Sequence, residues 1–229
     1  MGLPVEKPPR STRADLDAVP STKVAELING ELYVLPRPAP PHAMSTSRLG
    51  MKLGGPFDLG EGGPGGWRIF DEPELEFGPE GEEDVLVPDL AGWRIERLPR
   101  LPKTAQFKLA PDWICEVLSG RTETVDRAEK MAIYAREGVR YAWLLHPIRQ
   151  TLEVFALNDV RKWTVLDVFR GPKRVRAEPF DAVELDLSVL WPNEEEAPDE
   201  IDEDRDITPV PSSRPKRSRS RAQRQDRKR

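Results

Sequence analysis

Glu116 has the most unusual position of any charged residue in the sequence. It lies within WICEVL (113–118), a run that is apolar on both faces and typical of a central strand covered on both sides. A carboxylate buried there costs several kcal/mol unless it is paired, protonated or bound to a cation. Two interpretations are open: a structural residue in an ion pair or at a sheet rim, and a functional carboxylate.

Asp89 and Lys130 are two further candidates, each with an ordinary alternative. Asp89 follows Pro88, which cannot donate to a central ladder and marks a strand edge, a strand start or a bulge. Bulges often aim a side chain into an active site, but Pro-Asp also begins turns. Lys130 follows Asp126 by four residues on a predicted helix, the spacing of a stabilising surface ion pair. A helical wheel places Lys130 opposite the apolar face. That face comprises Val125, Ala128, Met131, Ala132 and Ala135.

The elements that would position these residues are mostly strands. Strands are predicted at 24–28, 31–35, 67–70, 75–77, 85–93, 113–118, 141–145, 152–157 and 163–169, and a closing segment at 183–191. Helices are predicted at 42–53 and 124–137, and a Gly/Pro-rich flexible loop at 54–66. The strand–helix–strand order across 113–145 implies a parallel strand pair with a right-handed crossover. The predicted fold class is therefore α/β (α+β), a mixed β-sheet core flanked by helices.

The charge distribution divides the chain into a body and two flanks. Residues 1–20 are rich in proline and charge and are predicted to form a flexible N-terminal arm, followed by a folded domain at 21–193. Residues 194–206 carry nine acidic residues and one arginine, whereas residues 207–229 carry nine basic residues and one aspartate. This acidic-then-basic tail (194–229) is predicted to be disordered. Because its two halves cancel, the body holds the net charge of −5.

Composition excludes several classes of protein. No stretch approaches the roughly 18–20 apolar residues of a membrane helix, and the N-terminus lacks the apolar region of a secretion signal. A single cysteine, Cys115, excludes a disulfide framework and cysteine-rich zinc sites, and two histidines exclude a three-histidine metal centre. A bound metal would therefore have mostly carboxylate ligands, which favours Mg²⁺ (or Mn²⁺). We expect a cytoplasmic protein in a reducing compartment, with no membrane attachment.

The motifs around the three charged residues resemble one known family. VPDL (87–90), EVLS (116–119) and DRAEK (126–130), followed by Tyr134 and GVRYAWLLHP (138–147), closely resemble the bacterial Uma2-like (DUF820) family of the PD-(D/E)XK restriction-endonuclease-like superfamily. The resemblance extends from ELINGELYVLPRPAPPH (26–42) through LEVFAL (152–157). The superfamily's usual lysine lies two residues after the glutamate, but position 118 here is leucine. The resemblance implies that this lysine has moved into the following helix, at Lys130.

The resemblance implies a nuclease-fold domain at 21–193 with Mg²⁺-dependent (or Mn²⁺-dependent) endonuclease activity on DNA. Asp89, Glu116 and the backbone carbonyl of Val117 would hold the metal, and Lys130 would orient the attacking water or offset charge in the transition state. Glu31 and His42 match early family positions. Glu31 is the better candidate for a supporting carboxylate, whereas His42 could cap a helix or bond to backbone.

Some features leave room for a different function. The acidic segment 71–80 would repel phosphate if it crowded the site. The alternative is a non-catalytic nucleic-acid-binding or interaction module on a nuclease scaffold. The basic tail could bind DNA non-specifically, or it could be a solvated segment masked by its acidic neighbour. Cutting both strands of a duplex would favour a symmetric homodimer.

Overall fold

Strand β7 (Trp113–Val117), which contains Glu116, lies in the interior of the main sheet with all five of its residues buried. The computed structural model describes residues 10–35 and 37–193. Its main sheet has the order β10-β9-β8-β7-β6-β3. The other strands are β3 (Trp67–Asp71), β6 (Leu90–Arg94), β8 (Tyr141–His146), β9 (Thr151–Leu157) and β10 (Trp163–Arg170). Among these six strands only β7 and β8 pair in parallel, so the parallel pair predicted across 113–145 is confirmed.

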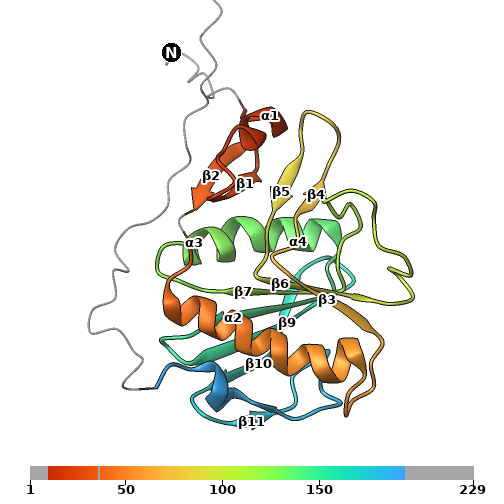
Figure 1. Cartoon of the computed structure of the whole chain (residues 1–229), viewed down its shortest axis with the longest axis vertical. Helices are drawn as coiled ribbons and strands as arrows, with labels where there is room; N and C mark the ends of the chain where they lie inside the picture. Colours follow the sequence, from red (N-terminus) through yellow and green to blue (C-terminus); the bar gives the residue numbers. More distant parts are fainter. Residues whose placement is uncertain (1–9, 36, 194–229) are drawn as a thin grey trace, which may run out of the picture.

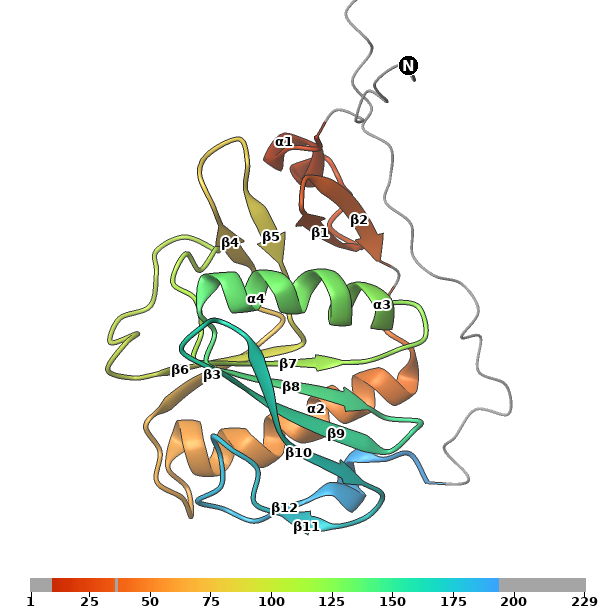
Figure 2. The same cartoon turned by 180° about the vertical axis from the view of Figure 1, so that it is seen from behind.

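Helices cover both faces of this sheet, which confirms the predicted fold class. Helix α2 (Pro40–Leu53) lies on one face, and α3 (Glu123–Val125) and α4 (Met131–Glu137) lie on the other (Figures 1 and 2). Side chains of β7 alternate between the two faces, as the pleat requires. Trp113, Cys115 and Val117 pack in the core that contains Leu49 and Leu53 of α2. The intervening positions, and so Glu116, face α3 and α4.

A second, antiparallel sheet has the order β2-β1-β5-β4. Its strands are β1 (Val24–Ile28), β2 (Glu31–Leu35), β4 (Leu75–Phe77) and β5 (Asp84–Leu86). The strands predicted at 24–28 and 31–35 pair as an antiparallel hairpin, and Asn29 and Gly30 have φ values of 53° and 83°, as a tight hairpin turn requires. The single strand predicted at 85–93 is wrong. Residues 87–89, which include Pro88, separate β5 in this sheet from β6 in the main sheet.

The predicted flexible arm requires correction over its second half. Helix α1 (Arg13–Asp17) begins after Thr12, and Thr12 and Asp15 form a reciprocal capping box. Leu16 is buried in a small core with Leu27 and Leu32 of the hairpin. Residues 10–20 are therefore packed on the second sheet. The remainder of the predicted arm, and the predicted disordered tail at 194–229, lie outside the described residues.

Other segments differ in detail from the predicted elements. Half of the predicted loop 54–66 is helical, because residues Gly54–Leu59 continue α2 as a π-helix that ends at Gly60 with φ of 73°. The closing segment forms β12 (Leu185–Asp186), which pairs with β11 (Arg174–Val175), and a 3-10 turn at Leu187–Leu190. None of the helices within the described residues has the length and apolar character needed to cross a membrane.

Candidate active site

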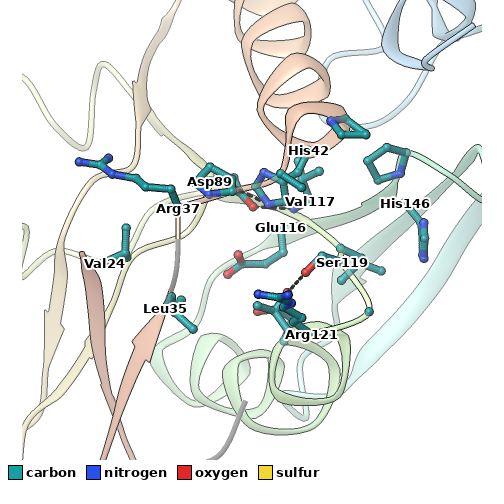
Figure 3. A pocket seen from close by; sticks show the side chains of 18 of the residues that line it. Val24, Leu35, Arg37, His42, Asp89, Glu116, Val117, Ser119, Arg121 and His146 are labelled. Carbon is teal, nitrogen blue, oxygen red and sulfur yellow. Dashed lines mark hydrogen bonds and ion pairs between the residues drawn. The ribbon is translucent and has the colours of Figure 1, made fainter. Parts of the chain in front are cut away.

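A cavity of about 420 Å³ lies at the C-terminal ends of the parallel strands β7 and β8. Ligand sites of open α/β sheets characteristically lie at this edge. Asp89, Glu116, Lys130 and His42 all line the cavity, although they come from four different parts of the chain. Figure 3 shows Asp89, Glu116 and His42 close together. The structure therefore brings together the three residues that the sequence singled out, with His42 beside them.

Lys130 is buried and is surrounded by carboxylates. Its Nζ lies 2.9 Å from Glu116 Oε1, 3.0 Å from Glu26 Oε1 and 3.4 Å from Asp126 Oδ1. Its side chain is only 3% exposed, so the interpretation of Lys130 as one half of a surface ion pair is wrong. The Tyr134 hydroxyl donates a further hydrogen bond of 2.5 Å to Glu116 Oε1.

The buried position of Lys130 follows from the local helix geometry. Residues Asp126–Lys130 form a π-helical turn between α3 and α4. The wider turn changes which side chains share a face, and a wheel of 3.6 residues per turn no longer applies. Ala128 and Ala132, placed on the apolar face by that wheel, are exposed, whereas Asp126 and Lys130 are buried. Such π-turns occur frequently at functional sites.

The cluster around Lys130 carries more acidic than basic groups. Three carboxylates, from Glu26, Glu116 and Asp126, face one ammonium group, and all four residues are at most 4% exposed. Burial raises the pKa of Glu116 well above its usual range, and it raises the pKa of Asp126 to about 6, although Lys130 acts in the opposite direction on both. Burial lowers the pKa of Lys130, but Glu116 and Glu26 outweigh burial and raise this pKa well above its ordinary value. The surroundings of Lys130 therefore favour its cationic form, and they contain more acidic groups than basic ones.

Asp89 is held in place by two hydrogen-bonding partners. The Val117 backbone N–H donates to Asp89 Oδ2 at 2.7 Å, and His42 Nε2 lies 3.2 Å from Asp89 Oδ1. Burial lowers the pKa of His42, but the hydrogen bond and the charge of Asp89 outweigh burial and raise this pKa above its ordinary value. His42 thus contacts a carboxylate and is not the helix cap or backbone partner that the sequence suggested, since the cap residue of α2 is Ala39.

Glu31 is not brought to the cluster. It is exposed on β2, where the Tyr33 hydroxyl donates to its Oε2 at 3.3 Å, and it is absent from the described residues that line the cavity. Glu26, on the paired strand β1, takes the supporting position predicted for Glu31. Its carboxylate also accepts a hydrogen bond of 2.7 Å from the Val87 backbone N–H. Glu26, a residue of the second sheet, therefore links that sheet to the cluster around Lys130. Glu26 is not among the residues that the sequence singled out, although, like Glu116, it is a single acidic residue in an otherwise apolar strand.

The acidic segment 71–80 crowds the cavity less than its composition suggests. Glu74 and Glu76 pair with Arg13 at 2.6 and 3.0 Å. Of this segment, Glu72 is the residue that lines the cavity, and its φ is +44°. Burial, together with the neighbouring Asp71 and Asp89, raises the pKa of Glu72.

The donor chemistry of the cavity fits a divalent cation. Asp89 and Glu116 supply carboxylate oxygens, and Val117 lines the same wall. Residues 10–35 and 37–193 contain no group of three or more Asp, Glu, His or Cys side chains arranged to bind a metal ion by themselves. Mg²⁺ is commonly bound by only one or two carboxylates and keeps several waters or substrate oxygens. A cation would also offset the excess negative charge beside Glu116.

Comparisons with known proteins identify the family and the fold of the chain. The model of the Uma2 family, described as "Putative restriction endonuclease", matches residues 13–189. The fold is similar to the crystal structure of "a putative nuclease belonging to DUF820" from Anabaena variabilis ATCC 29413, with a TM-score of 0.61 and 23% sequence identity. The alignment covers 79% of this chain and 97% of that chain. A search of curated proteins yields no match. At this identity, the likeness to the crystal structure establishes a shared fold.

Proposed function

Because the chain belongs to the Uma2 family, as its motifs indicated, we propose that the cavity is the active site of a metal-dependent endonuclease that hydrolyses DNA phosphodiester bonds. The observation that carries this proposal is the contact of Lys130 Nζ with Glu116 Oε1 at 2.9 Å, in the cavity that Asp89 also lines. A purely structural ion pair would balance its charges, whereas this cluster buries three carboxylates with one lysine. The excess of acid fits a site built for a cation.

Asp89, Glu116 and the backbone carbonyl of Val117 are the groups that would hold Mg²⁺ (or Mn²⁺). When bound, such a cation polarises the phosphate and lowers the pKa of the attacking water. Lys130 stabilises negative charge that develops on the phosphate and orients the water. His42 fixes the orientation of the Asp89 carboxylate, and Tyr134 does the same for Glu116.

Incubation of the full-length protein with supercoiled plasmid DNA and Mg²⁺ or Mn²⁺ tests the proposal. We expect nicking that requires the metal and that falls at least about 100-fold in Asp89→Asn and Glu116→Gln, which remove a charge and keep the side-chain shape. Glu153→Gln is the matched control, because Glu153 pairs with Arg127 on the helix surface, away from the cavity. Nicking that survives in both active-site variants contradicts the proposal.

The basic tail supports a second candidate, a nucleic-acid-binding module without catalysis. Nine lysine and arginine residues at 207–229 are sufficient to bind phosphate backbones in a salt-dependent manner. Deletion of residues 207–229 separates the two functions. A nuclease retains metal-dependent cleavage after the deletion, whereas a binding module loses DNA affinity and cuts nothing in either form.

Two further expectations follow from an endonuclease that acts on DNA. Such an enzyme would work in the cytoplasm of a bacterial cell, where its DNA substrate lies. Cleavage of both strands of a duplex favours a symmetric homodimer, which presents two active sites of opposite orientation. Sedimentation of the full-length protein with and without DNA measures that assembly.

A further inference from the structure

The two walls of the cavity each carry an arginine. One wall comes from the end of the β1–β2 hairpin and the segment after it, with Val24, Leu35 and Arg37. The opposite wall comes from the loop between β7 and α3, with Ser119 and Arg121. In Figure 3 Arg121 is drawn near the Glu116 carboxylate, whereas the Arg37 side chain extends away from it along the other wall. Both arginines, like Glu116, belong to the lining of the cavity.

The reactive groups are too deeply placed for an intact duplex. Glu116 and Lys130 are 2% and 3% exposed, so the scissile phosphate must enter the cavity to reach them. A volume of about 420 Å³ is near the lower end of the roughly 300–1,000 Å³ of pockets that enclose one small organic ligand. That space suits about one nucleotide of a strand. A strand held in a double helix must first unpair and unstack, which costs a few kcal/mol, whereas an unpaired strand enters without this cost.

The side chains on the cavity walls suit a DNA strand that is bound through its backbone and base faces, independently of its sequence. Val24, Leu35 and Ile148 offer apolar contact for a sugar or the face of a base. Arginine binds phosphate oxygens through two parallel N–H donors, which fixes both position and orientation. We propose that the cavity accepts a single unpaired DNA strand, with Arg37 and Arg121 binding phosphates on either side of the scissile one. This inference rests on the proposed nuclease function and names its substrate class.

Cleavage of matched substrates by the full-length protein with Mg²⁺ tests the substrate class. The probes are an end-labelled single-stranded oligonucleotide, the blunt duplex of the same sequence, and that duplex with an unpaired overhang. We expect the single strand to be cut at least about tenfold faster than the blunt duplex, because the duplex must first unpair. In the third probe we expect cuts within the overhang. A blunt duplex cut as fast as the single strand overturns the inference and leaves the nuclease proposal intact.

Variants of the two arginines test the assigned contacts. Arg37→Ala and Arg121→Ala should each raise KM for the single strand about tenfold, the effect of losing one charge-assisted hydrogen bond. Arg100→Ala, an exposed arginine outside the cavity, is the control and should leave KM unchanged. If neither cavity variant differs from this control, the inference is wrong.

Binding measurements keep the inference separate from the nuclease proposal. If no substrate is cut, the proposed function fails, and fluorescence anisotropy of the same labelled oligonucleotides on Glu116→Gln decides the inference. Tighter binding of the single strand than of the duplex, weakened by Arg37→Ala, supports an unpaired strand in the cavity. Equal binding of both probes, unaffected by Arg37→Ala, overturns it.

Discussion

The helical segment that begins at α3 and ends with α4 carries two groups of ion pairs, and they differ in their surroundings. Arg127, on the outer face, contacts Glu123 at 2.8 Å and Glu153 at 2.5 Å, and its side chain is 34% exposed. Lys130, three residues later, is 3% exposed within its group of carboxylates. Solvent screens the exposed first group, whereas the second group is buried and is screened much less.

The difference separates charges that solvent screens from charges that depend on their partners within the protein. Exposed ion pairs contribute little to stability and are easily replaced. Buried ionic groups are often less stabilising than apolar residues of the same size, and a buried excess of one sign is costly. The Lys130 cluster therefore weakens the folded protein when no cation is bound. We interpret it as a site whose charge is completed by a ligand.

The largest expected effect on stability comes from the removal of the buried cation. Lys130→Met leaves three buried carboxylates without a counter-charge and should lower the free energy of unfolding by about 3–5 kcal/mol, measured by urea titration in EDTA. Lys108→Met is the control, since Lys108 Nζ lies 2.9 Å from Glu76 Oε1 but its side chain is 74% exposed. A similar loss of stability in both variants would erase the distinction between the two kinds of ion pair.

A smaller effect of opposite sign is expected from the removal of one buried acid. Burial raises the pKa of Asp126 to about 6, so the folded protein keeps a proton that the unfolded chain releases at about pH 4. The stability of the wild type therefore falls as the pH rises from about 4 to about 6 and then levels off. At pH 7 without metal, Asp126→Asn should be more stable by up to about 3 kcal/mol, with the gain vanishing near pH 4.

Urea titrations at several pH values measure this gain, and Asp167→Asn, at an exposed position of β10, provides the matched control. A gain of equal size at pH 4 and pH 7 would rule out the buried charge as its cause.

The smallest effect is expected on the exposed face of the same helical segment. Arg127→Ala removes contacts with Glu123 and Glu153 and should lower the free energy of unfolding by at most about 1 kcal/mol. The loss should shrink further in high salt, which screens exposed charges. If Arg127→Ala lowers the free energy of unfolding as much as Lys130→Met does, and equally at low and high salt, the exposed and buried ion pairs do not differ in this way.

The sequence predicted the central elements of the site because those elements are specified locally. An apolar run on both faces identifies β7, and the strand–helix–strand order identifies its parallel neighbour β8. The link that contains Asp89 was harder to place, because apolar residues precede Pro88 and resume after Asp89. Pro88 indicates an interruption of the strand, but it does not show that β5 and β6 belong to different sheets. The capping pattern of Thr12 and Asp15 would have revealed α1.

The composition of the site was less accessible from sequence, because it depends on contacts between distant segments. Lys130 meets Glu26 from 104 positions earlier in the chain, and only tertiary structure shows that Glu26, and not Glu31, faces inward. The burial of Asp126 and Lys130 depends on the π-helical turn. A wheel with the ordinary helical period, and the assumption that charged residues face water, both fail there.

If the buried carboxylates form a cation site, calorimetric titration of Mn²⁺ into the full-length protein detects it directly. We expect binding by the wild type and by Glu153→Gln, with binding lost or at least about tenfold weaker in both Asp89→Asn and Glu116→Gln. Mn²⁺ binding of equal strength in all four proteins would contradict a cation site at these carboxylates.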